Sequence, residues 1–173
     1  MASKTQLAFA RQVYAAAVEA KTEIDPAFVT AQAMLETGWG SRVIGKANLF
    51  GITKGSQWDG DIVMVKTHEY FKTPKQKFKE PDHIVSVCKV AGKNLWYYTV
   101  MRAFKDFDSV GDCLKEHERL FQKPGYKDAW PCRKDPFKFA QKICDGVGCK
   151  YATDPTYLTT ITSIIKTIRR KCV

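Results

Sequence analysis

The stretch "AMLETGWGSR", residues 33–42, places one carboxylate, Glu36, directly before a Gly-Trp-Gly turn that ends a helix. A charged carboxylate is disfavoured there, because the C-terminal end of a helix is its negative end. The neighbours Met34, Leu35 and Trp39 are apolar, and desolvation by such groups also favours the neutral acid. Both effects raise the pKa of Glu36, as a general acid working near neutral pH requires. The alternative is a solvated glutamate at a helix end.

The helix that carries Glu36 is predicted over residues 26–37. Asp25 is suited to be its N-cap, and Pro26 fits the first helical position, where no N–H donor is needed. The predicted core stripe of this helix is Ala27, Phe28, Ala31, Met34 and Leu35. Glu36 projects off that stripe, on a flank with Val29, Gln32 and Ala33. This flank predicts a cleft wall.

Four more helices are predicted at residues 5–21, 110–122, 136–145 and 155–171. Between residues 62 and 104 the apolar pattern alternates instead, and "IVMVKTHEYF", "IVSVCKV" and "LWYYTVMRAF" are typical of strands. The tetrapeptide "AGKN" favours a hairpin turn. The sequence therefore predicts an α+β fold, mainly α. Residues 1–173 form one domain, a helical body with a small antiparallel β-lobe inserted at about residues 60–104.

The amino-acid composition indicates which kinds of partner the protein can bind. Lys and Arg number 28 against 18 Asp and Glu, so the formal net charge is +10 and the partner is expected to be anionic: nucleic acid, membrane headgroups or cell wall. No apolar run reaches the roughly 18 residues of a membrane span. The N-terminus lacks the basic region of a Sec signal peptide. No phosphate-binding or dinucleotide-binding motif is present, so no cofactor is expected.

The chain contains six cysteines. They form no CxxC pair, and the three histidines do not have zinc-finger spacing, so no metal site is expected. Disulfides are favoured over free buried thiols, with a pairing that the spacing leaves open. Disulfides without a Sec signal predict export by another route.

A second carboxylate, Glu69, lies in the strand "KTHEYF". Alternation puts it on one strand face with Val63, Val65, Thr67 and Phe71, and puts Ile62, Met64, His68 and Tyr70 on the other. A glutamate in line with apolar residues can reach into a cleft, and the alternative is that it faces solvent. Aromatic side chains are frequent near both carboxylates, as a carbohydrate cleft would need, although core packing explains them as well. The candidates are Trp39, Phe50, Trp58, Tyr70, Trp96, Tyr97 and Tyr98, with Tyr151 and Tyr157 from "YATDPTY".

Four ordered motifs, "AQAMLETGWGSR", "NLFGI", "THEY" and "YATDPTY", resemble the glucosaminidases of glycoside hydrolase family 73, which include the flagellar-rod peptidoglycan hydrolase domain. The resemblance spans roughly residues 24–165. It implies a lysozyme-like helical body with the β-lobe over the active-site cleft, and hydrolysis of the β-1,4 bond after N-acetylglucosamine in peptidoglycan. It assigns Glu36 as the general acid and Glu69 as the second carboxylate, and it places Tyr151 in the active site.

The same resemblance supplies candidate substrate-binding residues. Asn48, Phe50 and Gly51 match the "NLFG" stretch, and Trp39 matches the turn after the acid. Trp58, Tyr70 and Tyr157 complete the candidates. The segment from residue 71 to 103 is longer than is usual in the family, which predicts an extra hairpin that reshapes the cleft or contacts a partner.

Alternatives remain open at the sequence level. A muramidase or lytic transglycosylase also uses a lone glutamate at a helix end in a lysozyme-like body. A non-catalytic wall-binding module and a nucleic-acid-binding protein are other classes, the last supported by charge alone. For a wall hydrolase the predicted settings are a phage endolysin and a type VI secretion effector, which acts in the periplasm of a target cell. An effector would have an immunity protein that blocks the cleft as its partner.

Overall fold

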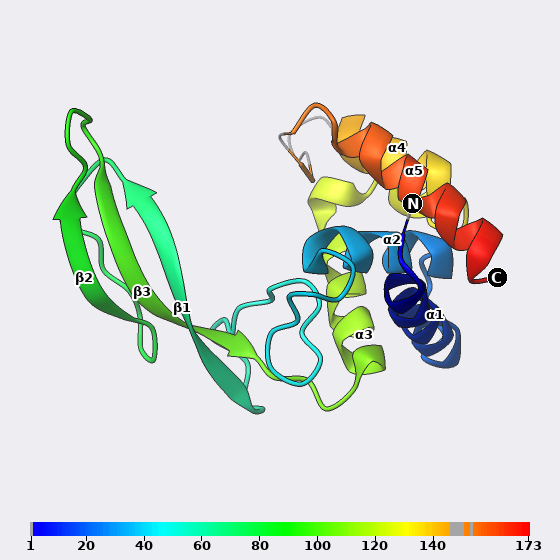
Figure 1. The fold of residues 1–173 in the computed structure, drawn as a ribbon, viewed down its shortest axis with the longest axis horizontal. Coiled ribbons are helices and arrows are strands. Elements are labelled where there is room, and N and C mark those ends of the chain that lie inside the picture. The colour runs from blue at the N-terminus through cyan, green and yellow to red at the C-terminus, as the bar shows by residue number, and fades with distance from the viewer. Residues whose placement is uncertain (1, 146–150, 153) are drawn as a thin grey trace. The chain divides into compact units, whose positions relative to one another are not determined.

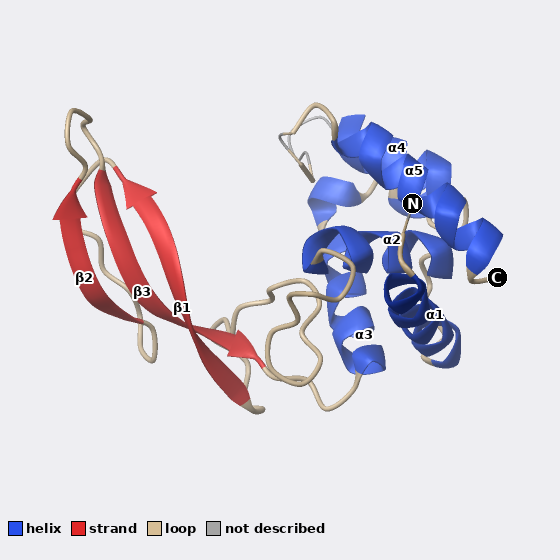
Figure 2. Cartoon of the chain, viewed as in Figure 1, coloured by secondary structure: helices blue, strands red, loops and turns tan. Residues whose placement is uncertain are grey.

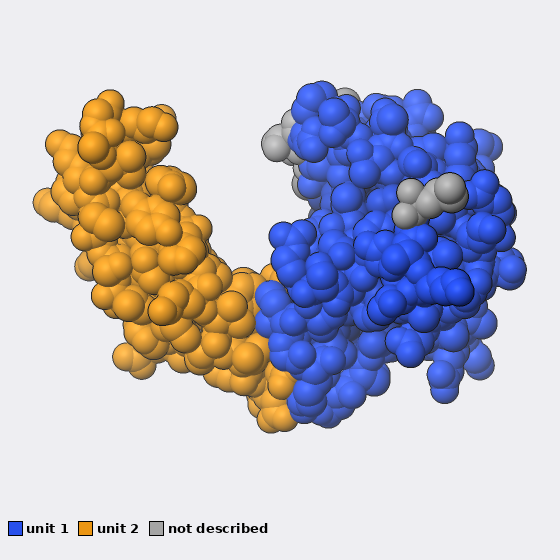
Figure 3. Space-filling view, in the orientation of Figure 1, with its two compact units in different colours: residues 1–50, 107–173 blue, residues 51–106 orange. Residues whose placement is uncertain are grey.

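The computed structural model describes residues 2–145, 151–152 and 154–173 (Figure 1). The elements are α1 (Lys4–Glu19), α2 (Pro26–Thr37), β1 (Ile62–Phe71), β2 (His83–Lys89), β3 (Trp96–Lys105), α3 (Val110–Phe121), α4 (Pro136–Asp145) and α5 (Tyr157–Lys171), with 3-10 turns at Pro124–Tyr126 and Trp130–Cys132. The helices belong to one compact unit, residues 1–50 and 107–173, and the strands to another, residues 51–106 (Figures 2 and 3). We call them the helical unit and the sheet unit. The predicted α+β class, mainly α, is confirmed.

α2 is the central helix of the helical unit, and α1, α4 and α5 pack against it. It begins at the predicted cap, where the Asp25 carboxylate accepts from the Ala27 N–H at 2.8 Å. The predicted flank of Val29, Gln32 and Ala33 is almost completely buried, so the expectation that it forms a cleft wall is wrong. These side chains belong to the core because helices cover α2 on several sides. Glu36 is the exposed residue of its last turn.

α5 begins two residues later than predicted. The Asp154 carboxylate accepts from the backbone N–H and from the hydroxyl of Thr156, both at 2.8 Å. This local turn places Asp154 outside the helix, and Thr156 takes the N-cap position. A side-chain oxygen that bonds two residues ahead competes with helix initiation at that point.

The sheet unit is a three-stranded antiparallel sheet in the order β1-β3-β2. The predicted hairpin joins β2 to β3, closed by a bond of 2.9 Å from the Val90 N–H to the Leu95 carbonyl. Residues 72–82 cover one face of the sheet. The buried Tyr98 donates to the Thr73 carbonyl at 3.2 Å, and the Phe78 ring packs on Phe71 at 6.2 Å. Residues 72–82 therefore cover a small core that belongs to this unit.

The disulfide prediction is wrong for the five cysteines that the structure describes. Cys88, Cys113, Cys132, Cys144 and Cys172 are free thiols, and Cys149 lies outside the described residues. Cys113 is fully buried in α3, where its sulfur accepts from the Leu49 N–H at 3.4 Å and where burial raises the pKa of the thiol to about 12. Such a cysteine packs as a small apolar residue.

None of the helices in the described residues has both the length and the apolar composition needed to cross a bilayer. The His, Cys, Asp and Glu side chains of the described residues form no group of three or more that is suited to hold a metal ion.

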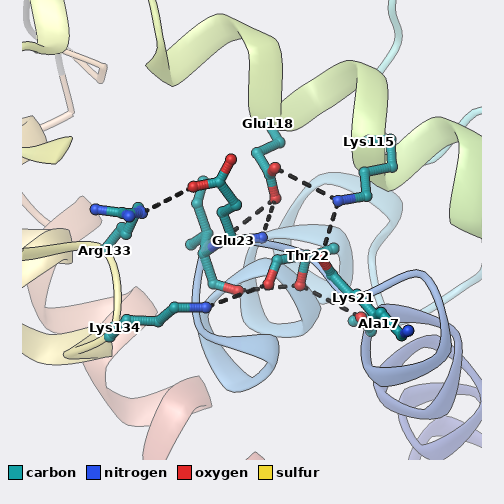
Figure 4. A network of polar contacts seen from close by, with 9 residues as sticks. Ala17, Lys21, Thr22, Glu23, Lys115, Glu118, Arg133 and Lys134 are labelled. Carbon is teal, nitrogen blue, oxygen red and sulfur yellow. Dashed lines mark hydrogen bonds and ion pairs between the residues drawn. The ribbon is translucent and has the colours of Figure 1, made fainter.

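A buried carboxylate fixes the segment that leads into α2 (Figure 4). Glu118 of α3 is 3% exposed, and its Oε2 accepts from the backbone N–H groups of Glu23 at 2.7 Å and Ile24 at 3.4 Å. Lys115 lies 3.7 Å from the other carboxylate oxygen and donates to the Lys21 carbonyl at 2.8 Å. The side chain thus satisfies backbone donors that would otherwise be buried without a partner.

Glu118→Ala is expected to lower the free energy of unfolding by about 2–3 kcal/mol, because it leaves buried backbone donors unsatisfied. Chemical denaturation measures the change. The control is Arg119→Ala on the same helix, which breaks an ion pair with Glu116 whose arginine is 74% exposed, and which is expected to cost less than about 1 kcal/mol. Equal losses in the two variants would contradict a structural role for the buried carboxylate.

Candidate active site

The turn after Glu36 has an uncommon backbone. Gly38, Trp39 and Gly40 all have positive φ, at 57°, 60° and 86°. Gly38 caps α2 in the left-handed conformation, and the Trp39 N–H donates to the Met34 carbonyl at 2.7 Å. A Cβ atom on Gly40 would lie 2.6 Å from the ring of Phe9, so only glycine fits there. α2 therefore ends at Thr37, the residue after Glu36, and the turn begins at Gly38.

Thr37 connects the helix to this turn. Its hydroxyl donates to the Ala33 carbonyl at 2.6 Å and accepts from the Gly40 N–H at 2.8 Å. Its carbonyl accepts from the Arg42 N–H at 2.9 Å. These bonds hold the turn against the last helical residues, and they keep Arg42 near enough for its charge to act on Glu36.

Tyr151 comes from the far end of the chain and forms a side-chain hydrogen bond with Glu36. Its backbone N–H donates to the Ile143 carbonyl at 3.0 Å, which ties it to α4. Its ring lies 5.5 Å from the rings of both Phe121 and Tyr157. The phenol is therefore held on three sides, with its hydroxyl directed to the carboxyl of the acid.

Burial raises the pKa of Glu36, and this effect is larger than the opposing effects of the Tyr151 hydrogen bond and the Arg42 charge. The residue still has an exposed edge. A carboxyl with a raised pKa that is also open on one side is suited to give a proton to a bound molecule. Burial also raises the pKa of Tyr151, so the phenol stays a donor.

Tyr157 and Gln32 form a second polar pair in the same region. Gln32 lies one turn before Glu36 on α2, and its Nε2 donates to the Tyr157 hydroxyl at 2.9 Å. Both residues are buried, and burial raises the pKa of Tyr157. Tyr157 was predicted from the sequence as a candidate, and its hydrogen-bond partner Gln32 was not. The available signal was a long polar side chain four residues before the acid, in an otherwise apolar helix.

The "NLFG" stretch packs inside the helical unit up to Phe50. Asn48 is 1% exposed and pairs with Ile44 through two backbone hydrogen bonds of 3.0 and 3.1 Å. The ring of Phe50 stacks on His117 at 3.6 Å, and His117 contacts Phe121 at 5.2 Å. Burial lowers the pKa of His117 to about 3, so this ring is neutral. Because Phe121 also contacts Tyr151, aromatic rings connect Phe50 to the phenol beside Glu36.

The remaining candidates belong to the sheet unit. Glu69 lies on the covered face of the sheet, and its Oε1 accepts from Arg102 at 2.5 Å, while Arg102 also pairs with Asp82 at 2.7 Å. Trp58 donates from its indole N–H to the Asp61 carbonyl at 2.9 Å. Tyr70 is 60% exposed on the opposite face from Glu69. Gly51, with φ of 61°, begins this unit.

The structure thus brings Glu36, Tyr151 and Tyr157 together in the helical unit, and the sheet unit contains Glu69, Trp58 and Tyr70. Trp39 is half-buried in the turn that follows the acid. Glu36 and Tyr151 were both predicted from the sequence and lie together in the structure, whereas the contacts of Arg102, Asp82 and Gln32 were not predicted.

Several known proteins are similar to this chain. It is 30% identical over 141 residues to the peptidoglycan hydrolase FlgJ of Vibrio parahaemolyticus, which covers 78% of this chain and 37% of that protein. It is also 30% identical over 138 residues to the autolysin of Enterococcus faecalis, covering 78% of this chain and 16% of the autolysin. A probable N-acetylmuramidase of Lactococcus lactis is 28% identical over 149 residues, 81% of this chain and 28% of that protein. The chain spans about a third of the length of the FlgJ proteins it matches.

Solved structures show the same fold. The catalytic domain of the Listeria monocytogenes autolysin Auto has a TM-score of 0.69 at 25% identity, over 98% of this chain and 87% of that one. A truncated glycoside hydrolase domain of Salmonella typhimurium FlgJ has a TM-score of 0.68 at 23% identity, over 95% and 98%. The lysozyme-like fold that the motifs implied is therefore confirmed.

The family described as mannosyl-glycoprotein endo-beta-N-acetylglucosaminidase matches residues 12–170, nearly the whole chain. The match begins inside α1 and ends inside α5, so it includes the acid, the phenol and the whole sheet unit. The chain belongs to this glucosaminidase family, glycoside hydrolase family 73.

Proposed function

We propose that this glycoside hydrolase cleaves the β-1,4 bond after N-acetylglucosamine in peptidoglycan, with the two units acting as one catalytic domain. The observation that carries the proposal is the desolvated carboxyl of Glu36, hydrogen-bonded to Tyr151 at the open end of α2. The substrate is supported by the names of the FlgJ and autolysin relatives. The net charge of +10 suits an anionic wall polymer.

In this mechanism Glu36 gives its proton to the glycosidic oxygen as the bond breaks and an oxocarbenium-like sugar forms. The carboxylate that results accepts the hydrogen bond of Tyr151, and the Arg42 charge favours it as well. Burial thus favours the protonated form of Glu36 before the reaction, and Tyr151 and Arg42 stabilise the anion produced by proton transfer. A positioned acid of this kind contributes about 10²–10⁴-fold to the rate.

Glu69 is the candidate for the second half of the reaction. An acceptor-only carboxylate can serve as nucleophile when the two carboxyls lie about 5–5.5 Å apart, or as base for water at about 6.5–9.5 Å. Its ion pair with Arg102, which Asp82 also binds, fixes the direction of the side chain on β1. The competing mechanism is attack by the 2-acetamido group of the substrate, which needs no second carboxylate.

The proposed sugar contacts differ in exposure. Trp39, three residues after Glu36 in the sequence, is half-exposed, and so is Trp58 in the sheet unit. Tyr157 is buried behind Tyr151. Asn48 and Phe50 are proposed to support the site from within, since Asn48 is fully buried and Phe50 stacks on His117. Gly51 is the first residue of the sheet unit.

A muramidase is the second candidate, and the Lactococcus relative named as a probable N-acetylmuramidase favours it. Lytic transglycosylases would use the same acid and leave 1,6-anhydro ends. The raised pKa of Glu36 disfavours a wall-binding module without activity, because binding alone does not need such a carboxyl. The setting, phage endolysin or type VI effector with an immunity protein, stays a prediction that the neighbouring genes test.

Glu36→Gln is expected to lower the release of fragments from purified peptidoglycan by at least about 10²-fold, since the amide has no acidic proton to give. Mass spectrometry of borohydride-reduced fragments from the active protein should show reduced N-acetylglucosamine ends. Thermal unfolding of both proteins checks that the fold is kept.

Four outcomes would contradict this account. A Gln variant with more than about a tenth of the activity would exclude Glu36 as the acid. Reduced muramic acid ends would indicate a muramidase, and anhydro ends a transglycosylase. Absence of fragments from the active protein would support the binding module.

Glu69→Gln is expected to lower kcat by about 10²-fold or more, because the amide serves neither as nucleophile nor as base. Glu80→Gln is the matched control, because this exposed glutamate lies in the same unit and should change kcat little. Steady-state hydrolysis of soluble glycan strands measures both. Unchanged kcat in Glu69→Gln would favour attack by the substrate's acetamido group.

Arg42→Gln is expected to move the falling, alkaline limb of the kcat/KM profile to higher pH. The Arg42 charge lowers the pKa of Glu36, so its removal lets the acid keep its proton at higher pH. Arg119→Gln removes an equal charge from an exposed ion pair in α3 and should leave the limb in place. A shift to lower pH in Arg42→Gln would show that the limb does not report Glu36.

A further inference from the structure

The sheet unit has a second face, which we call the outer face, that residues 72–82 do not cover. Side chains on a strand alternate, so His68 and Tyr70 point to the side opposite Glu69. The register places Tyr70 across from Tyr97, and His68 across from Thr99. β2 extends the same face with Ser86 beside Thr99. None of the residues proposed for catalysis lies on it.

Three aromatic rings lie next to one another on this face. The rings of His68 and Tyr97 are 5.2 Å apart and nearly parallel, at 12°. The Tyr70 ring lies 5.1 Å from Tyr97, is tilted by 55° to it and is 60% exposed. The Thr99 hydroxyl lies 3.4 Å from His68 Nδ1, so hydroxyl and ring nitrogen groups adjoin the rings. Sugars need this combination, because their C–H faces stack on rings while their hydroxyls bond polar groups.

The charged residues around the outer face indicate which kind of ligand it can bind. Every residue of the sheet unit is described, and its six acidic residues, Asp59, Asp61, Glu69, Glu80, Asp82 and Asp106, all lie off this face. Lys66 lies on the face, in the same row as Met101. Lys72, Lys89 and Lys93 are exposed around the end of the sheet where Tyr70 and Tyr97 lie. These four lysines form no ion pair within the unit, so their charge is available to an anionic ligand.

We propose that the outer face binds a peptidoglycan strand, with the rings of Tyr70 and Tyr97 stacking on its sugars and the lysines attracting the carboxylates of its stem peptides. This inference rests on the proposed function, because it takes peptidoglycan as the substrate. The contact would retain the enzyme on the insoluble wall in addition to what the Glu36 site holds.

A purely structural explanation exists, since aromatic pairs across strands stabilise sheets. It predicts that loss of the Tyr70 ring lowers stability and leaves wall binding unchanged. The two explanations therefore separate when binding and unfolding are measured on the same variants.

The experiment is cosedimentation with purified peptidoglycan sacculi, in a Glu36→Gln background so that the polymer is not digested. Tyr70→Ala is expected to weaken binding by about threefold to tenfold, the loss typical of one removed ring contact. Tyr70→Phe should keep the parent affinity. Lys66→Glu should also weaken binding, and this loss should shrink at high salt because the attraction is screened. Val85→Ala, at a 52% exposed position on β2, is the matched control that should bind like the parent.

Parent-like binding by both Tyr70→Ala and Lys66→Glu would overturn the proposal, as would an equal loss in Val85→Ala. Urea denaturation of each variant shows whether a loss comes from unfolding, and the exposed Lys66→Glu change tests the face if Tyr70→Ala does not fold. Fragment release by the protein with Glu36 intact is followed on the same sacculi. Absence of fragments would contradict the proposed function, whereas normal fragments with unchanged Tyr70→Ala binding would contradict only the outer face.

Discussion

The hydrogen bond between Tyr151 and Glu36 is the interaction on which the site depends, because it joins two segments more than a hundred residues apart in sequence. Each partner is held independently. The left-handed turn at Gly38–Gly40 ends α2 directly after the acid, and the Ile143 carbonyl and Phe121 ring hold the phenol. Burial raises the pKa of Glu36 and this hydrogen bond lowers it, so the surroundings of the carboxyl favour its neutral form and its ionised form by separate contacts.

Local sequence signals predicted the ends of α2 and the two faces of β1. Asp25-Pro26 and Gly38 mark the ends of α2, and the structure has both ends where the caps place them. The strict alternation of β1 predicted that Glu69 and Tyr70 point to opposite faces, which the burial of the strand agrees with. Cap residues and period-two alternation act within a few residues, so a single sequence is sufficient to recognise them.

Contacts between distant segments were not predictable in the same way. The flank of Gln32 was expected to line a cleft and is buried, because α1, α4 and α5 all pack on α2. The buried Glu118 carboxylate resembles any polar residue of an amphipathic helix until Glu23 and Ile24 bring their N–H groups to it. The number of cysteines suggested disulfides, whereas the five described thiols are free and Cys113 packs in the core. Each error concerns tertiary packing that periodicity does not encode.

The central claim is that burial raises the pKa of Glu36 and that the hydrogen bond from Tyr151 partly lowers it again. Titration of the side-chain carboxyl by ¹³C NMR tests it most directly, with the resonance assigned by its loss in Glu36→Gln. The account predicts a titration midpoint above the ordinary glutamate value and a further rise in Tyr151→Phe, because removal of the hydrogen bond leaves only the Arg42 charge to oppose the effect of burial. A midpoint at or below the ordinary value, or a fall in Tyr151→Phe, would contradict it.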